Sequence, residues 1–299
     1  MALVDQDLKT LHYAIKIGDV EVVSLQDGML YVPVTVIEPD GDAAEKKRIE
    51  EILPNPLIWS NNVFLIYLDG KRILIDAGGG DLFAPESGQL IAGLAGVGIR
   101  PADITDICLT HLHPDHIGGL TLHGNVAFPK ARLHVAKAEL DYWIAEESRQ
   151  SAPEHHRVFF EALERFLPYL NSGSVETFED NEEVFRGLRS HLLPGHTPGL
   201  SAFTLSSRHD RVMFLGDLFN EPAQVEHPDL KLRFDWDSDL AIETRKKTLE
   251  FAVRENLLVA PPHAAFPGFF KVEKNSGIYR LRQETLPRED LTLSSTASR

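Results

Sequence analysis

The residues with the clearest capacity for chemistry are three histidines and an aspartate within six positions of the chain. Imidazole nitrogens and carboxylate oxygens are the ligands that zinc and similar divalent cations prefer. Histidines of an ordinary polar loop have no reason to follow H-x-H-x-D-H spacing, so the segment predicts a metal site. The four residues lie in the segment THLHPDHIGG, residues 110–119, as His111, His113, Asp115 and His116.

Apolar segments beside these residues indicate that buried strands position them. Residues 104–109 form such a segment directly before the motif. His196 lies between turn-forming residues with an apolar strand after it, whereas Asp217 and His263 each follow an apolar strand. Taken singly, each of the three is better explained as an ordinary turn or core polar group. Because they follow the first motif along the chain in this order, the three residues complete a ligand set for two metal ions.

The order H-x-H-x-D-H, His, Asp and His resembles the metallo-β-lactamase superfamily, over about residues 21–270. The segments NVFLI at 62–66 and ILIDAG at 73–78 are similar to the opening hairpin of that family. This resemblance implies an α/β protein with a four-layer αβ/βα sandwich. We expect one catalytic domain over residues 1–299, with possible fraying at both ends.

Three later segments resemble one branch of the superfamily, the methyl parathion hydrolases and related quorum-quenching lactonases. They are FDWDSD at 234–239, ETRKK at 243–247 and HAAFPG at 263–268. The branch implies a small-molecule ester substrate and a homodimer, for which no independent sequence signal exists.

The resemblance also implies a role for each ligand. A hydroxide between two ions would be the nucleophile, because a bound cation lowers the pKa of water from ~15.7 towards ~7. Zinc is the expected metal, with manganese, cobalt or iron as alternatives. Asp115 and Asp217 are the expected catalytic residues, Asp217 as the bridge and Asp115 also as a group that orients the hydroxide. The family assigns His111, His113 and His196 to one ion, Asp115, His116 and His263 to the other, and Asp217 to both.

Asp76 ends an apolar strand and is expected to accept the free ring N–H of a ligating histidine. From the residues alone, a turn aspartate before Gly78, Gly79 and Gly80 is an equal alternative. No Lys-Ser/Thr pair follows these glycines, so a phosphate-binding loop is not indicated.

Composition excludes several classes of protein. With 30 Lys and Arg against 45 Asp and Glu, the net charge is −15, which argues against nucleic acid or an anionic membrane as a partner. The single cysteine, Cys108, allows no internal disulfide and is expected to be a buried thiol. No apolar run approaches the ~20 residues of a membrane helix. Neither a membrane segment nor a signal peptide is recognised at residues 1–9, so a cytoplasmic location is expected.

Hydrophobic periodicity predicts the main elements. Paired strands are expected within 13–36 and further strands around Phe64 and Leu74, while a surface loop is expected at 39–47 and a frayed tail at 284–299. The predicted helices are 87–97, 137–147, 157–167 and 240–256.

The substrate is less determined than the reaction centre, since one fold hosts many activities. A zinc β-lactamase of the commonest type has a cysteine where this chain has Asp217, and no counterpart of the glyoxalase II helical region is evident. A lactone, acyl-homoserine lactone-like or aromatic, is the expected substrate. An organophosphate triester or aryl ester is the alternative, and a non-catalytic metal-binding sensor and a diiron redox protein rank lower.

One departure from the lactonase pattern concerns the bridging aspartate. Acyl-homoserine lactonases often have a tyrosine three residues after it, and this chain has Asn220, which favours the methyl parathion hydrolase-like branch. Trp143 is the preferred aromatic pocket residue, and core packing is the better explanation for Phe83 and Phe160. The full set of expected pocket residues is Trp143, Phe83, Phe159, Phe160, Phe219, Asn220, Phe266 and Phe269.

Overall fold

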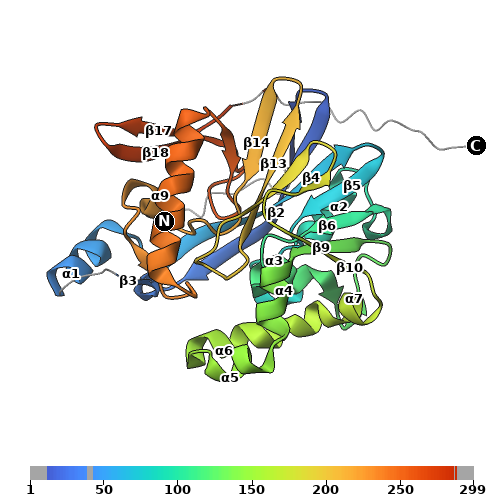
Figure 1. The fold of residues 1–299 in the computed structure, drawn as a ribbon, viewed down its shortest axis with the longest axis horizontal. Helices are drawn as coiled ribbons and strands as arrows, with labels where there is room; N and C mark the ends of the chain where they lie inside the picture. The colour runs from blue at the N-terminus through green and yellow to red at the C-terminus, as the bar shows by residue number, and fades with distance from the viewer. Residues whose placement is uncertain (1–11, 39–42, 286, 288–299) are drawn as a thin grey trace, which may run out of the picture.

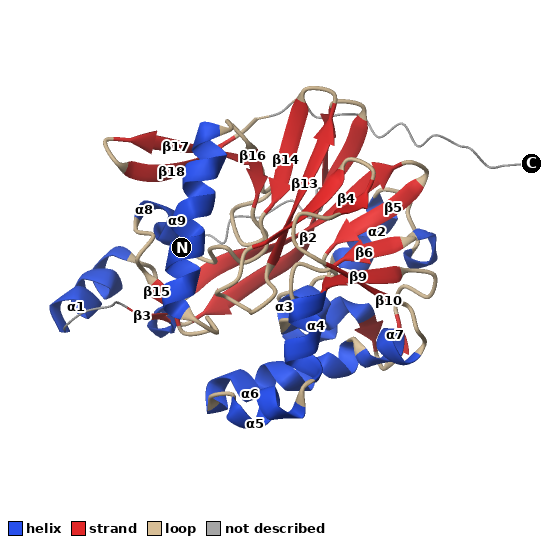
Figure 2. Cartoon of the chain, in the orientation of Figure 1, coloured by secondary structure: helices blue, strands red, loops and turns tan. Residues whose placement is uncertain are grey.

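Two seven-stranded sheets form the centre of the molecule (Figures 1 and 2). The computed structural model describes residues 12–38, 43–285 and 287. Helices cover the outer face of each sheet, so the layers follow the order helix, sheet, sheet, helix. The predicted four-layer α/β sandwich is confirmed.

The first sheet contains the amino-terminal strands. Its first four strands are antiparallel and the remaining three are parallel, as expected for hairpins followed by crossover connections. In spatial order the strands are β1 (His12–Ile17), β2 (Val20–Val32), β4 (Leu57–Leu68), β5 (Lys71–Ile75), β6 (Asp106–Cys108), β9 (Arg132–Ala136) and β10 (Val175–Phe178).

The second sheet contains the carboxy-terminal strands. Its fourth and fifth strands are parallel and its other pairs antiparallel, so its second, fourth and fifth strands all run in one direction. Their carboxyl ends therefore lie at the same edge of the sheet. In spatial order the strands are β11 (Glu183–Phe185), β12 (Leu188–Leu192), β13 (Ser201–Ser207), β14 (Asp210–Phe214), β16 (Leu258–Ala260), β17 (Phe270–Asn275) and β18 (Ile278–Gln283).

The helices on the first sheet come from the middle of the chain. The predicted helix 137–147 is present but divided at Ala145, and the predicted helix 157–167 is part of a longer series of short helices. The predicted helix 87–97 is confirmed over a shorter span. These helices are α2 (Leu90–Gly96), α3 (Pro114–Ile117), α4 (Lys137–Ile144), α5 (Glu146–Ser151), α6 (Glu154–Glu161) and α7 (Leu167–Asn171).

A long helix, α9 (Ser238–Arg254), covers the second sheet and confirms the prediction for 240–256. It begins earlier than predicted because the Asp237 carboxylate accepts a hydrogen bond from the Leu240 amide and caps the first turn. The expected loop at 39–47 is wrong from Ala43 onward, since α1 (Ala43–Ile52) begins there, and residues 39–42 lie outside the described residues. Most of the expected tail, 288–299, also lies outside them.

The remaining elements are short. Within the described ranges, no helix is both long and apolar enough to span a membrane. The short elements are α8 (Ala223–Glu226), β3 (Ile37–Glu38), β7 (Thr121–Leu122), β8 (Asn125–Val126), β15 (Lys231–Leu232) and the 3₁₀ helices η1 (Val34–Val36), η2 (Gly80–Phe83), η3 (Pro101–Asp103), η4 (Gly118–Leu120) and η5 (Ala162–Arg165).

Aromatic and branched side chains fill the space between the two sheets. Phe64 of β4 lies against Phe214 of β14 and against Phe269, with ring centroids 5.1 and 5.6 Å apart. Cys108 is fully buried in this layer, as expected, and burial raises the pKa of its thiol well above the usual value. This core holds the two sheets, and hence their strand ends, in one relative position.

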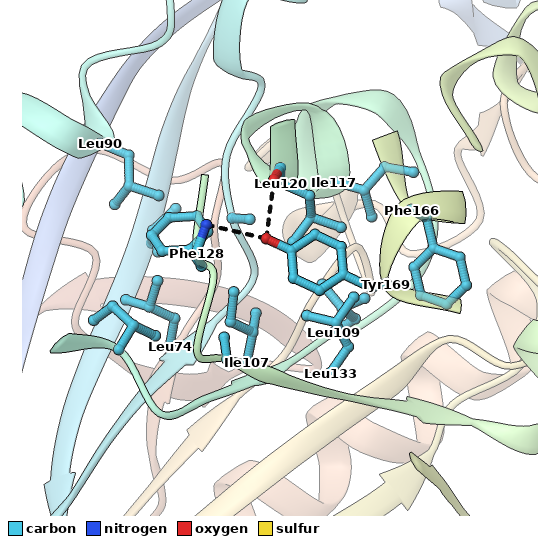
Figure 3. Packing of buried hydrophobic residues seen from close by; sticks show 14 of the residues in the cluster. Leu74, Leu90, Ile107, Leu109, Ile117, Leu120, Phe128, Leu133, Phe166 and Tyr169 are labelled. Carbon is cyan, nitrogen blue, oxygen red and sulfur yellow. Dashed lines mark hydrogen bonds between the residues drawn. The ribbon is translucent and has the colours of Figure 1, made fainter. Parts of the chain in front are cut away.

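A second core lies between the first sheet and its helices (Figure 3). Tyr169 of α7 is buried there, and its hydroxyl accepts a hydrogen bond from the Phe128 amide at 3.1 Å and donates to the Leu120 carbonyl at 3.0 Å. Leu120 lies four residues after His116, so the Tyr169 hydroxyl connects the helical layer to the segment that follows the H-x-H-x-D-H motif.

We expect Tyr169→Phe to lower the free energy of unfolding by ~1–3 kcal/mol, because the buried Phe128 amide loses its acceptor, whereas the Leu120 carbonyl still accepts from the Ala127 amide at 2.9 Å. Tyr67→Phe is the matched control, since the Tyr67 hydroxyl is buried and makes no hydrogen bond within the described part of the chain. That variant should be as stable as the wild type or more stable. Urea denaturation measures both, and equal losses would contradict the role given to Tyr169.

Candidate metal centre

The predicted ligands all follow strands whose carboxyl ends meet at one edge of the sandwich. His111 and His113 lie in the loop after β6, and Pro114 then begins α3, where its missing N–H costs nothing. The one turn of α3 contains the next two ligands, Asp115 and His116. The second sheet contributes the others: His196 after β12, Asp217 after β14 and His263 after β16.

The seven side chains form two groups whose ligand atoms lie within 4.8 Å of one another in each group. Six of the seven are buried, and Asp115 is partly buried. One group is His111, His113 and His196, and the other is Asp115, His116, Asp217 and His263. The structure therefore brings together all the ligands that the sequence predicted.

Asp217 lies between the two groups. Its Oδ2 is 3.4 Å from His196 Nε2 and 3.8 Å from His111 Nε2. Its Oδ1 is 3.1 Å from His116 Nε2 and 3.2 Å from His263 Nε2. His263 Nε2 is also 3.3 Å from Oδ2, so this ring lies near both oxygens, whereas His116 faces Oδ1 and His111 and His196 face Oδ2. Imidazoles on both sides of the carboxylate are the arrangement that a bridging ligand requires.

Three unpartnered atoms test whether this set fits metal ions. His111 Nε2, His116 Nε2 and Asp217 Oδ1 are buried and make no hydrogen bond among the described residues. Buried polar atoms without a partner cost free energy, and a coordinated cation would satisfy all three. The separations of 3.1–3.8 Å also match the ~3.3 Å between ligand atoms of a tetrahedral ion with bonds of ~2.0–2.1 Å. The residues fit two divalent ions.

Electrostatics agrees with this assignment. Burial alone would raise the pKa of the Asp115 and Asp217 carboxyls, but the adjacent His116 and His263 rings hold both pKa values well below the usual range. Burial alone would lower the pKa of His263, but Asp217 and Asp115 raise it to about 10. The site thus favours positive charge, which a proton on imidazole supplies without metal, so metal binding should release protons.

Acceptors on the far side of three rings orient the imidazoles. His116 Nδ1 donates to Asp76 Oδ2 at 2.8 Å, as predicted for Asp76, and His196 Nδ1 donates to Asp235 Oδ1 at 2.9 Å. His263 Nδ1 lies 2.9 Å from the Ser60 carbonyl and donates to it. In each ring Nε2 is then left as the acceptor for metal.

The partner residues are held in turn by the backbone. Asp76 has a left-handed backbone with φ of 65°, and its carboxylate also accepts from the Thr110 amide and hydroxyl at 2.8 and 2.9 Å. Asp76 therefore fixes both the ring of His116 and the start of the ligand loop. Asp235 was not predicted, although the FDWDSD segment that contains it marked the branch resemblance.

Glu139 is another functional residue that the sequence did not reveal. It is fully buried in α4, and its Oε1 accepts from the Leu112 amide at 2.9 Å and from Trp143 Nε1 at 2.6 Å. Its Oε2 accepts from the Thr197 hydroxyl at 2.7 Å and the Gly199 amide at 2.9 Å. One carboxylate thus joins the loop of His111 and His113 to the loop of His196.

An apolar pocket of about 470 Å³ opens onto the metal centre. Phe159 and Asn220 line it, as predicted, together with His113, Asp115, His196 and Asp217. Phe83 also lines it, although core packing was the preferred explanation for this residue. The sequence did not indicate the other apolar residues of the lining, which are Met29, Leu30, Val32, Pro33, Trp59, Ala84, Pro114 and Phe234.

Five predicted pocket residues are corrected because they do not line this pocket. Trp143 is buried, and its indole N–H donates to Glu139. Its ring makes an edge contact with the His113 ring, with centroids 5.5 Å apart. Phe160 packs against Trp143 in the helical core, with ring centroids 4.6 Å apart, which agrees with core packing as its preferred explanation. Phe219 and Phe269 are core residues, and Phe266 lies half-buried outside the lining residues.

The fold and the site together define a dinuclear metal-binding α/β sandwich. Residues 58–255 match the metallo-beta-lactamase superfamily, and the chain belongs to that superfamily. Among solved structures it is similar to AidC, a dizinc quorum-quenching lactonase in complex with the product N-hexanoyl-L-homoserine. That likeness has a TM-score of 0.84 and 28% identity over 94% of this chain and 100% of AidC.

Two further relatives are informative. The hydrolase AbOPH of the β-lactamase superfamily has a TM-score of 0.83 and 25% identity over 93% of this chain and 98% of AbOPH. An N-acyl homoserine lactonase from Bacillus cereus is 27% identical over 175 residues, which are 58% of this chain. The match spans 61% of that relative's length. The superfamily match and the two ligand groups agree on a dinuclear metal-binding site.

We expect Asp235→Ala to weaken metal binding by ~10–100-fold, because His196 loses the acceptor that orients its ring. Competition with a chromogenic chelator measures the affinity. Asp237→Ala is the matched control from the same loop, since Asp237 caps α9 and contacts no predicted ligand. It should lower stability by ~1 kcal/mol with unchanged metal affinity. Equal metal affinities in the two variants would refute the role of Asp235.

Glu139→Gln should destabilise the protein, because an amide NH₂ would face donors that now share a carboxylate. Each buried donor left unsatisfied costs ~1–3 kcal/mol. Thermal unfolding of the metal-free protein isolates this effect from metal binding. Asp141→Asn, on the exposed side of α4, provides the control and should change stability by less than ~0.5 kcal/mol. A Glu139 variant as stable as this control would show that the cross-link is dispensable.

Proposed function

We propose that this protein is a dinuclear metal-dependent hydrolase that opens a lactone ring. The observation that carries the proposal is the position of Asp217, shared between two groups of imidazoles at the base of an apolar pocket. Zinc is the metal that best suits this mixed set of imidazole and carboxylate ligands. His111, His113 and His196 would hold one ion, Asp115, His116 and His263 the other, and Asp217 both.

Two such ions, when bound, activate water at neutral pH and polarise an acyl or phosphoryl oxygen. The protein's part is to hold its ligands in position before substrate arrives. Asp76, Asp235 and the Ser60 carbonyl fix the rings, so little reorganisation is needed during reaction. Asp115 faces the pocket beside His263, at 3.3 Å, and is the side chain best placed to orient an attacking water.

The pocket supports a neutral and largely apolar substrate. Its walls are mostly apolar and aromatic, and its volume of about 470 Å³ lies within the range of small-molecule sites. The lactonase relatives support a lactone in particular, since AidC binds an N-acyl homoserine product and the Bacillus cereus relative is an N-acyl homoserine lactonase.

A second candidate is the hydrolysis of an organophosphate triester or aryl ester. The aromatic side chains Trp59, Phe83, Phe159 and Phe234 favour it, because they could stack on an aryl leaving group. The same metal centre serves either reaction, so the choice lies with the pocket.

The test is the metal-to-protein ratio of the purified enzyme together with a hydrolysis panel. We expect about two metals per chain, loss of activity on chelation and recovery with zinc, manganese or cobalt. Lactones should exceed methyl parathion-type triesters, aryl esters and a β-lactam in kcat/KM. Triesters leading the panel would favour the second candidate, and no turnover after reconstitution would refute both.

Asp217→Asn should keep the fold but lose most activity and one metal, because the bridging charge is removed. Circular dichroism and metal analysis accompany the kinetics. Asp210→Asn, at the exposed start of β14, is the control and should keep both metals. Near-wild-type turnover in the Asp217 variant would exclude a bridging role.

A further inference from the structure

The segment ETRKK, which marked the branch resemblance, lies in α9 and contains a buried arginine. Arg245 is only 1% exposed, although its guanidinium carries a charge. Burial lowers the pKa of this guanidinium, and the Asp235 carboxylate opposes the shift. Taking a charged group out of water is unfavourable, so the contacts that Arg245 makes in the core must offset that cost.

Those contacts hold the loop that follows the bridging aspartate. Arg245 Nε donates to the carbonyl of Leu218, the residue after Asp217, at 2.9 Å. Its Nη1 donates to the Pro228 carbonyl at 2.8 Å and to the Leu230 carbonyl at 2.9 Å. The three carbonyls all belong to the segment between β14 and α9. Because a guanidinium is planar and its donors have fixed directions, it sets the relative position of all three.

A buried glutamine extends this network to the carboxylate itself. Gln224 Nε2 donates to the same Leu230 carbonyl at 3.2 Å, and its Oε1 accepts from the Asn220 amide at 2.9 Å. The Asn220 side chain in turn donates to Asp217 Oδ2 at 2.5 Å. The position of this Oδ2 atom therefore depends on the loop that Arg245 organises.

The same part of α9 holds the loop of His196. The Thr244 hydroxyl donates to the Pro194 carbonyl at 2.7 Å. A Cβ atom on Gly195 would lie 2.4 Å from the Cα atom of Ala241, so this loop lies directly against the helix. Helix α9 thus supports two ligand-bearing loops of the second sheet.

The group of Asp115, His116 and His263 has its supports in the first sheet instead. Asn61 of β4 donates to the Asp115 carbonyl at 3.0 Å. Asn62 donates to the carbonyls on either side of His263 at 2.9 and 2.8 Å. These contacts come from the strand β4 and involve no residue of α9.

Helix α9 therefore supports the three-histidine group (His111, His113 and His196) through the loop of its last member and through the Oδ2 atom of the bridging carboxylate. We infer that Arg245 and Thr244 are positioning residues for the ion of the three-histidine group. The inference rests on the dinuclear centre of the proposed function, and it adds that the two ions have separate supports. One ion can then be weakened while the other stays bound.

Arg245→Met and Thr244→Val test this inference. The first keeps an unbranched chain without donors, and the second replaces one hydroxyl by a methyl group. We expect one zinc ion to stay bound and the other to bind ~10–100-fold more weakly, the usual effect of losing a residue that orients a ligand. Stepwise competition with a chromogenic chelator measures both affinities, and circular dichroism monitors folding. Lys247→Met, exposed in the same segment, is the matched control and should keep both affinities.

Asn62→Ala is the converse variant, because Asn62 supports the loop of His263. Crystals grown with one equivalent of zinc show by anomalous scattering which group is filled. The three-histidine group should be filled in Asn62→Ala and the other group in Arg245→Met. If Arg245→Met does not fold, Thr244→Val decides, since it removes a single hydroxyl.

Equal weakening of both ions in the α9 variants would overturn the inference. Lower stability with both affinities unchanged would overturn it too, because a purely structural role gives that result. None of these measurements needs turnover. Unequal weakening in a protein that cleaves no ester refutes the proposed function alone, equal weakening in an active lactonase refutes the inference alone, and a wild type that binds no metal refutes both.

Discussion

The sharing of one buried carboxylate by four imidazoles is the interaction on which this structure depends. Asp217 is only 3% exposed, and His111, His196, His116 and His263 approach it from two sides. Such a concentration of ligands is unfavourable unless cations compensate it, since buried polar atoms otherwise lack partners. The surrounding structure holds these groups together despite that cost.

The two sheets contribute different ligands, so the connections between the sheets are as important as the ligands themselves. Asn62 of β4, in the first sheet, donates to the carbonyls of Pro262 and Ala264 at 2.9 and 2.8 Å and so brackets His263 from the second. Glu139 makes the corresponding connection between the histidine loops. Both residues are polar and buried, and both bind backbone groups of ligand-bearing loops.

The pocket has mostly apolar walls and a small number of polar side chains close to the metal centre. Aromatic and aliphatic side chains would suit an apolar ester, and the two ions that the ligands would hold could act on a carbonyl or a phosphoryl group. Discrimination must then come from the few polar atoms close to the reacting bond. Asn220 is a buried polar side chain of this lining outside the ligand set, and its NH₂ group donates to Asp217.

Motif spacing together with the family resemblance was enough to predict the fold class, the seven candidate ligands and the partner role of Asp76, because metal chemistry restricts residue type and local spacing. The composition of the pocket depends instead on how the side chains pack in three dimensions. Trp143 and Phe159 both lie in helical segments that the sequence predicted, yet Trp143 turns into the core to satisfy Glu139 and Phe159 faces the cavity. Glu139 and Asp235 have partners 58 and 39 residues away along the chain and, unlike Asp76, neither was given a role by the family resemblance. No local periodicity encodes such contacts, which arise only when the two sheets pack.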